Sequence, residues 1–332
     1  MPDDVAPPAV ILIAGPTGSG KSAFALAIAQ EIGGLIVNAD ALQVYSDLHI
    51  VSARPSAADT ALAPHRLYGH IDGAESYSVR RWLDQACKEI AEARTRGQPV
   101  IVVGGTGLYF LSLLRGLAEV PSVPDTVRSR LRAEAESLSD DALYARLTAC
   151  DPVGASRLDG ADRQRVLRAL EVFEATGQAL SAWQAAPHEG ALATSLTCRL
   201  VVAPDREALY RRIDARFEAM VAGGAVAEVE RLVARDLDPA LPIMKAIGVP
   251  QIAAVLKGEL ALAEAISAAA QASRRYAKRQ MTWARGQMAD WQWLSEVIEP
   301  DPHAPTPRLT PAARNALGEI LLPGSQVRSP PG

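Results

Sequence analysis

Gly15-Pro16-Thr17-Gly18-Ser19-Gly20-Lys21-Ser22 is the stretch that decides the fold, because it matches G-x-x-x-x-G-K-[ST] at every fixed position. The apolar run 10–14 before it predicts a buried strand, and residues 23–32 after it are rich in good helix formers. This order brings backbone N–H groups and the positive end of a helix to an anion. Lys21 adds a point charge, and the Ser22 hydroxyl is placed to bind Mg²⁺. The stretch therefore predicts a loop that binds a di- or triphosphate.

Length and composition limit the class of protein. The chain has 332 residues, which is long for one domain, so we expect a core plus an added part. The three cysteines lack metal-ligand spacing and favour reduced thiols in a cytoplasm. No apolar run approaches the length of a membrane span, and residues 1–9 are unlike a secretory signal. We therefore expect a cytoplasmic protein with no membrane partner.

Two polar residues follow predicted strands at the edge of the sheet where the glycine loop lies. Asp40 follows the apolar run 35–39, and ligands of open parallel sheets bind beyond the carboxyl ends of strands. Its carboxylate is a metal ligand, a general base or a hydrogen-bonded structural group. The strand 99–103 leads into Gly-Gly-Thr, where an ATP-hydrolysing protein carries an aspartate near Mg²⁺. An ordinary ATPase is thus disfavoured, and Thr106 is either a contact to phosphates or part of a structural turn.

The hydrophobic pattern of the sequence changes after about residue 121, where strand-like runs end and helical patterns dominate. Strand-like sequence returns at residue 197. We therefore predict an α/β fold, with a parallel-sheet core of the P-loop NTPase or kinase type and an inserted all-helical domain. The predicted parts are a disordered N-terminus at 1–9, a discontinuous catalytic core at 10–121 and 197–298, a helical insertion at 122–196 and a disordered, proline-rich tail at 299–332.

Basic residues gather on two predicted helices. Arg165 and Arg168 lie three apart on one face of the helix 162–176, either as solvated surface or as a patch for phosphates. The last long helix, about 261–285, has few acidic partners within a turn, which favours polyanion binding. Its basic residues are Arg274, Arg275, Lys278, Arg279 and Arg285.

The ordered series of motifs resembles the tRNA dimethylallyltransferase family of bacterial type over about residues 10–295. After the glycine loop the series comprises residues 40–45, 52–55, 65–67, 103–109, 162–165, 168–172, 216–217 with Met220, 245–248, and 277–280 with Trp283. Each motif alone is weak, and their order and spacing make the resemblance specific.

This resemblance implies both a fold and an activity. In that family a P-loop kinase-like core carries an inserted helical domain. The loop holds the pyrophosphate of dimethylallyl pyrophosphate rather than ATP. The prenyl group goes to N6 of the adenine at tRNA position 37, beside the anticodon, after the base is flipped into a channel through the protein. We expect tRNA and dimethylallyl pyrophosphate as partners, Mg²⁺ as the cofactor, and a monomer.

Residue roles follow from the same resemblance. Asp40 is the general base, and Thr106 is the second catalytic residue. The pyrophosphate site is formed by Gly15, Thr17, Gly18, Ser19, Gly20, Lys21, Ser22 and Arg216, with Mg²⁺ bound through Ser22. The residues that face tRNA are Asp40, Ala41, Leu42, Gln43, Arg128, Gln164, Arg165, Val166, Leu167, Arg168, Lys245 and Gly248.

The chain departs from the family pattern at two places, and other classes remain open. Ala41 stands where serine is usual, and Val249-Pro250 stand where tyrosine and a basic residue are common. A small-molecule P-loop kinase would share the core but needs no helical insertion. An adenylate isopentenyltransferase would resemble this chain only in the core. A non-catalytic RNA-binding protein would give Asp40, Lys21 and Thr106 no purpose.

Overall fold

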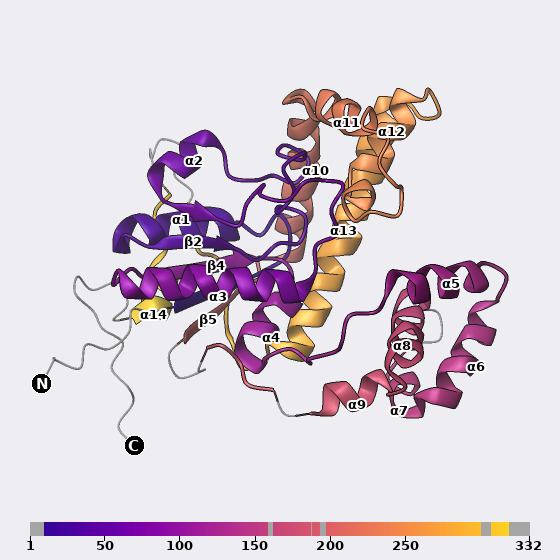
Figure 1. The fold of residues 1–332 in the computed structure, drawn as a ribbon. Coiled ribbons are helices and arrows are strands. Elements are labelled where there is room, and N and C mark those ends of the chain that lie inside the picture. Colours follow the sequence, from indigo (N-terminus) through magenta and orange to yellow (C-terminus); the bar gives the residue numbers. More distant parts are fainter. Residues whose placement is uncertain (1–9, 159–161, 187, 193–196, 300–306, 319–332) are drawn as a thin grey trace, which may run out of the picture. The chain divides into compact units, whose positions relative to one another are not determined.

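The computed structural model describes residues 10–158, 162–186, 188–192, 197–299 and 307–318. The chain forms two compact units, Met1–Leu114 with Ala191–Gly332, and Arg115–Gly190 (Figure 1). We call them the core unit and the helical unit. The sequence predicts an insertion at 122–196, and the helical unit begins and ends somewhat earlier than that. The N-terminus 1–9, expected to be disordered, lies outside the described residues.

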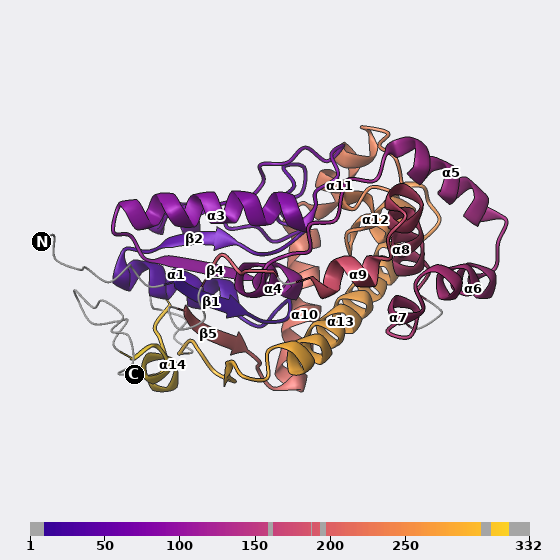
Figure 2. The same ribbon diagram turned by 60° about the horizontal axis from the view of Figure 1, so that its bottom comes forward.

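A parallel sheet organises the core unit, which confirms the predicted fold class. Its six strands are ordered β3-β2-β4-β1-β5-β6, and every pairing is parallel (Figure 2). The strands are β1 Val10–Ala14, β2 Leu35–Asn38, β3 His65–Arg66, β4 Val100–Gly104, β5 Thr197–Val202 and β6 Gln292–Leu294. The central strands β1, β2 and β4 are buried along their whole length. Such continuous apolar runs are typical of strands covered by helices on both faces.

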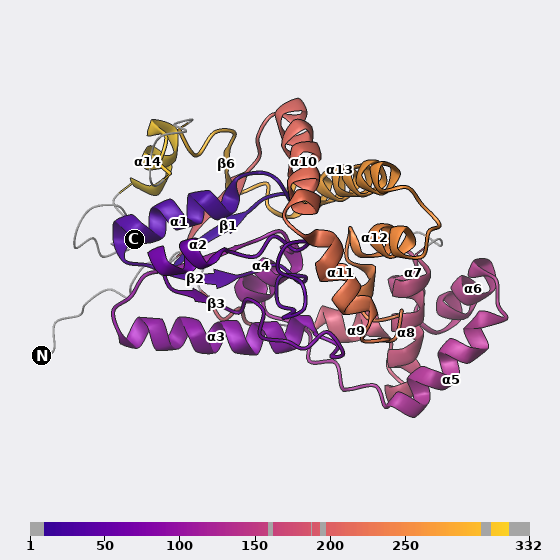
Figure 3. The same ribbon diagram turned by 90° about the horizontal axis from the view of Figure 1, so that it is seen from above.

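Helices α1 (Lys21–Ile32) and α3 (Val79–Thr95) cover opposite faces of this sheet (Figure 3). Phe24 and Ile28 of α1 pack against Ile11 and Ile13, which alternate with residues that face the other side of β1. On the α3 side, the Trp82 indole N–H donates to the Asn38 carbonyl at 2.7 Å. The parallel strands therefore deliver their carboxyl ends to one edge, where functional side chains can gather.

A second group of helices in the core unit faces the carboxyl ends of the strands (Figures 1 and 2). They are α10 Arg206–Ala222, α11 Ala225–Val233, η2 Ile243–Lys245, α12 Val249–Leu256 and α13 Leu262–Gln287. Their apolar side chains pack with the loop after β2 around Tyr45, Leu48 and Phe217. Two further helices of this part are α2 Ala57–Leu62 and α4 Gly107–Arg115. Among the described residues, no helix is both long and apolar enough to cross a bilayer.

The C-terminal stretch differs from the expectation of disorder. Residues 307–318 contain α14 (Pro311–Leu317), whose Ala313 and Leu317 are buried against the α1 side of the sheet. The Thr310 hydroxyl accepts from the Ala313 N–H at 3.2 Å, and a proline at the first helical position costs no hydrogen bond. The proline that suggested disorder thus begins a helix. The rest of the predicted tail, 300–306 and 319–332, lies outside the described residues.

The helical unit has its own small core. It comprises α5 Asp125–Glu136, α6 Asp140–Cys150, α7 Pro152–Ala155, α8 Arg163–Thr176 and α9 Leu180–Ala185. Leu143 and Leu147 of α6 pack against Val166 and Leu170 of α8. Asp151 is almost fully buried, and its carboxylate accepts from Gly154 N–H at 2.7 Å and Ser181 N–H at 3.0 Å. This one carboxylate therefore caps α7 and holds the start of α9.

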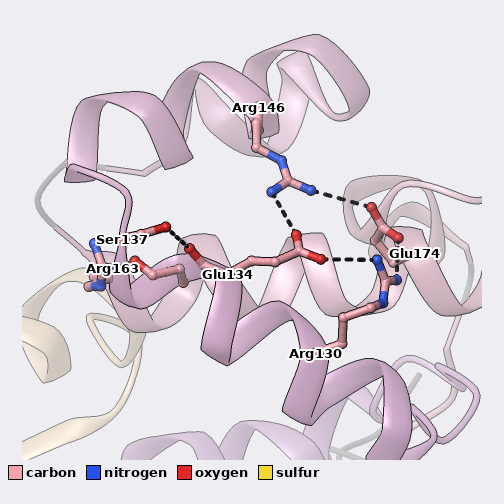
Figure 4. A network of polar contacts seen from close by, with 7 residues as sticks. Arg130, Glu134, Ser137, Arg146, Arg163 and Glu174 are labelled. Atoms are coloured by element: carbon pink, nitrogen blue, oxygen red, sulfur yellow. Dashed lines mark hydrogen bonds and ion pairs between the residues drawn. The ribbon is translucent and has the colours of Figure 1, made fainter.

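Ion pairs join the three longer helices of this unit (Figure 4). Arg130 of α5 contacts Glu134 at 3.2 Å and Glu174 of α8 at 2.9 Å. Arg146 of α6 contacts the same two carboxylates at 3.3 and 3.5 Å, which closes a ring of four side chains. Single exposed ion pairs contribute little to stability, but a closed ring fixes the helices in one register. Arg163 donates to the Ala135 and Leu138 carbonyls and closes the end of α5.

Candidate active site

The glycine loop between β1 and α1 leaves the first turn of the helix open to an anion. Gly18 and Gly20 have φ of 78° and 90°, the left-handed region that favours glycine. Gly20 is the N-cap of α1, and no side chain caps the helix. The free N–H groups and the helix dipole therefore favour a negative ligand here, as the sequence predicts.

Two cations stand beside this loop. The Lys21 ammonium donates to the Pro16 carbonyl at 3.2 Å, and Arg216 of α10 donates to the Thr17 hydroxyl at 3.3 Å. Neither forms an ion pair with a carboxylate in the described part of the chain. Burial lowers the pKa of Lys21 to about 8; the Asp40 charge opposes this shift and the Arg216 charge adds to it. Two closely placed, desolvated cations favour a polyanionic ligand, which relieves their repulsion.

Asp40 is clamped at the end of β2 by its neighbour Asn38. The buried Asn38 amide accepts from the Asp40 N–H at 2.9 Å and donates to the Asp40 and Leu67 carbonyls, each at 3.0 Å. One Asp40 carboxylate oxygen, Oδ1, accepts from the Leu42 N–H at 3.0 Å. The other oxygen accepts no hydrogen bond from the described residues. An open carboxylate oxygen on a rigid backbone is suited to accept a proton from a ligand.

Thr106 connects the end of β4 to the same turn. Its N–H donates to the Ala39 carbonyl at 3.1 Å, and its hydroxyl oxygen accepts from the Ala41 N–H at 3.0 Å. The hydroxyl hydrogen is not used by any described residue. Thr106 can therefore be both part of a structural turn and a contact to phosphates, because its hydroxyl oxygen accepts a hydrogen bond while its hydroxyl hydrogen stays available to a ligand.

Gln280 of α13 joins the two loops, a role that the sequence motif did not reveal. Its amide oxygen accepts from the Thr17 N–H at 3.0 Å, and its amide nitrogen donates to the Gly105 carbonyl at 2.9 Å. A Cβ at Gly105 would lie 2.3 Å from that nitrogen, so a side chain at this position would displace the Gln280 amide. Both amide groups are thus committed, and the spacing of the glycine loop from the β4 loop is fixed.

Two cavities meet this group of residues. The Asp40 cavity has a volume of about 80 Å³ and is lined by Asp40, Thr17, Arg216, Leu42 and Ser52 among others. The Trp283 cavity measures about 260 Å³ and is lined by Gly15, Thr106, Leu108 and Trp283 among others. Tyr276 lines both cavities, and burial, together with the Asp40 charge, raises the pKa of its phenol. The site therefore offers space for one ligand on each side of Tyr276.

The loop after Asp40 is held by a buried carboxylate that the sequence analysis missed. Glu228 of α11 is 4% exposed and accepts three backbone N–H groups, from His49 at 2.7 Å and from Ile50 and Val51 at 2.8 Å. The Gln43 amide in turn donates to the Ser52 and Ala53 carbonyls at 3.0 and 2.8 Å. Glu228 thus shapes the wall of the Asp40 cavity. No local pattern marks it, since its partners lie far away in sequence.

The predicted tRNA-facing residues of the core unit fall into two groups. Ala41, Leu42 and Gln43 are half-buried beside Asp40. Lys245 is exposed, whereas Gly248 is buried with φ of 104° at the N-cap of α12. Val249 and Pro250 form the first turn of that helix, where a missing N–H costs nothing. The departure at Val249-Pro250 is therefore compatible with the local fold.

The remaining predicted tRNA residues belong to the helical unit. Gln164, Arg165 and Arg168 are exposed, and Leu167 is half-buried. Val166 corrects the expectation, because it is 1% exposed in the unit's apolar core and its side chain cannot contact an RNA. The buried Glu171 has Arg132 at 3.2 Å, Arg168 at 3.9 Å and Arg128 at 4.0 Å. Arg128 also contacts Asp125 at 2.8 Å, so two carboxylates face three arginines and the cluster keeps a net positive charge.

The donor set is compatible with Mg²⁺ bound mainly through a ligand. Ser22 lies in the first turn of α1, is exposed, and its hydroxyl makes no hydrogen bond within the described residues. Mg²⁺ commonly keeps several waters and takes one or two protein oxygens in addition to phosphate oxygens. Groups of three or more potential His, Cys, Asp or Glu ligands do not occur in the described part of the chain.

Comparisons with known proteins agree with this geometry. The family model described as IPP transferase matches residues 43–287. The tRNA dimethylallyltransferase of Azorhizobium caulinodans is 54% identical over 284 residues, which cover 86% of this chain and 91% of that protein. The tRNA isopentenylpyrophosphate transferase of Bacillus halodurans is 31% identical with a TM-score of 0.61, covering 86% of this chain and 89% of that one. A eukaryotic dimethylallyltransferase acting on tRNA is 28% identical with a TM-score of 0.73, covering 86% of this chain and 73% of that one. The chain belongs to the IPP transferase family.

Proposed function

We propose that this chain is a tRNA dimethylallyltransferase. It transfers the dimethylallyl group of dimethylallyl pyrophosphate to N6 of the adenine at tRNA position 37, beside the anticodon, and gives N6-isopentenyladenosine. The observation that carries the proposal is the pairing of an anion-binding loop with the open carboxylate oxygen of Asp40. The family membership and the names of the relatives support the same reaction.

The proposed step has three coupled parts. The N6 amine is a weak nucleophile because its lone pair is delocalised into the ring, so its proton passes to Asp40 as the bond to C1 of the prenyl group forms. The bond between C1 and the pyrophosphate oxygen breaks, and its electron pair leaves with pyrophosphate. Lys21, Arg216 and the N–H groups of α1 stabilise the charge that grows on this leaving group. The free Thr106 hydroxyl hydrogen donates to a pyrophosphate oxygen.

The cofactor and the surroundings complete the proposal. Mg²⁺ bound through Ser22 and the pyrophosphate oxygens would supply further charge neutralisation. The adenine occupies the Asp40 cavity after flipping from the anticodon loop, and the prenyl donor lies against the glycine loop. Enclosure by Tyr276 and Gln280 keeps water from an allylic centre that water would otherwise capture. We place the enzyme in the cytoplasm as a monomer.

The test is a transfer assay with labelled dimethylallyl pyrophosphate and an unmodified tRNA transcript. We expect label on the transcript with adenine at position 37, and none on a matched transcript with guanine there. AMP and ATP are run in parallel. Label on AMP but not on tRNA would instead indicate an adenylate isopentenyltransferase. Steady ATP turnover without tRNA would contradict the pyrophosphate assignment of the loop.

A further inference from the structure

A third and larger cavity lies in the core unit, apart from the proposed active site. It measures about 530 Å³, within the usual range of small-molecule sites. It shares no lining residue with the Asp40 and Trp283 cavities. Ala203 and Pro204 after β5, together with Leu294 and Ser295 at the end of β6, place it at the carboxyl edge of the sheet. This is the edge at which open parallel sheets bind ligands.

The charge around this cavity is positive only. Arg206 of α10 and Lys278 and Arg285 of α13 line it, and no acidic residue does. None of the three forms an ion pair within the described part of the chain, whereas Arg274, one turn before Lys278, pairs with Asp214. The nearby Asp205 carboxylate is occupied as the helix cap, accepting from the Glu207 and Ala208 N–H groups at 2.9 and 3.1 Å. Three unneutralised cations around one hollow favour an anionic ligand.

The rest of the lining is apolar and aromatic. Leu209 and Ala277 are buried and belong to one apolar cluster at its floor. The half-buried rings of Tyr210 and Trp293 also line the cavity, and the Trp293 indole N–H is fixed to the Met288 carbonyl at 3.1 Å. The Arg206 guanidinium lies 5.2 Å from the centre of the Tyr210 ring. Aromatic surface beside cations is the combination that binds a planar base and its phosphate.

We infer that this cavity is a second ligand site, which binds a nucleotide. Its phosphate contacts Arg206, Lys278 and Arg285, and its base packs against Tyr210 and Trp293. The same chemistry is present in a free nucleoside phosphate and in one nucleotide of a single RNA strand. The inference does not depend on the identity of the prenyl acceptor. It goes beyond the proposed function because the cavity is separate from both active-site cavities.

The test measures binding while pyrophosphate fills the glycine loop. AMP and a single-stranded oligouridylate are titrated by calorimetry against the full chain in saturating Mg²⁺ and pyrophosphate. Wild type is compared with Arg206→Ala/Lys278→Ala/Arg285→Ala and with Thr282→Trp, which fills the cavity but keeps its charges. Arg211→Ala is the matched control on α10, because Arg211 lies outside the cavity. All three charge changes are on exposed side chains, so the triple variant should melt as wild type does.

Each outcome decides the inference. If AMP binds and the triple variant and Thr282→Trp each weaken it about tenfold or more, while Arg211→Ala does not, the site takes a free nucleotide. If only the oligouridylate binds and shows the same losses, the site takes an RNA strand. If neither probe binds, or if both cavity variants bind as tightly as wild type, the inference is wrong.

Discussion

The surroundings of Asp40 fix its backbone and leave one carboxylate oxygen without a partner among the described residues. The buried Asn38 amide fixes the backbone on both sides of the carboxylate, and the Leu42 N–H occupies Oδ1. Asp40 lines the Asp40 cavity, together with Arg216. Lys21 and Arg216 lie close enough that the Asp40 charge opposes the lowering of both their pKa values by burial. Of the three roles open to Asp40 in the sequence, this geometry favours the base.

Replacement of Asp40 by asparagine separates a base from a metal ligand. The asparagine oxygen can still accept from the Leu42 N–H, so the turn should persist. We expect single-turnover prenylation to slow by about two to four orders of magnitude, because the proton acceptor is lost. Binding of the pyrophosphate donor and Mg²⁺ should hardly change. Asp84→Asn on the exposed side of α3 is the charge control, and recovery of the rate at high Mg²⁺ would contradict the base assignment.

From the lowered pKa of Lys21 we predict that pyrophosphate binding depends on pH. With a pKa lowered from 10.5 to about 8, its ammonium is charged at neutral pH and loses its proton as the pH rises through 8. Above that pH, we expect the affinity of the free enzyme for pyrophosphate to fall by up to about tenfold per pH unit. Lys21→Arg stays charged and reports the ionisation of the ligand alone. The ratio of the two dissociation constants between pH 7 and 9.5 is the measurement, and a constant ratio would refute the prediction.

At the scale of elements, the sequence predicts the helices and strands better than it predicts the contacts between them. Local sequence patterns predict the strands β1 and β4 from their apolar runs. They likewise predict the helices α1 and α13, because each pattern depends only on neighbours in sequence. The hydrogen bond from the Thr17 N–H to Gln280 joins residues that are 263 apart in sequence, so no local hydrophobic periodicity predicts it. Glu228 likewise looks like any glutamate on an amphipathic helix. Short elements such as β3, with two residues, carry too little pattern to be read.

From the hydrogen bonds of Glu228 we predict that α11 controls the shape of the Asp40 cavity. In Glu228→Gln, one amide oxygen must serve the N–H groups of His49, Ile50 and Val51, and at least one of them loses its partner. We expect unfolding stability to fall by about 1–3 kcal/mol. The KM for tRNA should rise more than kcat falls, because the same loop holds Gln43, and the KM for the prenyl donor should stay constant.

The control for this change lies on the same helix. Glu230 is exposed and forms no ion pair within the described residues, so Glu230→Gln removes the same charge without touching the loop. If the two variants show equal kinetics, or if Glu228→Gln raises the KM of both substrates alike, the cavity-shaping role is wrong.

At the scale of the whole molecule, the change from strand-like to helical sequence patterns predicts the helical unit but not its boundaries. Helix propensity does not distinguish α4 of the core unit from α5 of the helical unit, so the boundary at Arg115 depends on tertiary contacts. Burial also decides function within α8. Val166 and Arg165 are neighbours among the residues expected to face tRNA, yet Val166 lies in the apolar core and Arg165 is exposed to solvent. Only the exposed positions can serve a partner.

The last prediction concerns this exposed face of α8. The Arg165 side chain is 70% exposed and contacts Asp162 at 3.1 Å, and the Arg168 side chain is 45% exposed and lies 3.9 Å from Glu171. Neither belongs to the ion-pair ring or the apolar core, so Arg165→Ala/Arg168→Ala should fold normally. We expect weaker tRNA binding and a shallower salt dependence, by up to about two phosphate contacts. The affinity for dimethylallyl pyrophosphate should be unchanged, because the site that we propose for that ligand is in the core unit. Arg80→Ala/Lys88→Ala on α3 changes the net charge equally, so an equal loss of tRNA affinity in both double variants would mean that only overall charge matters.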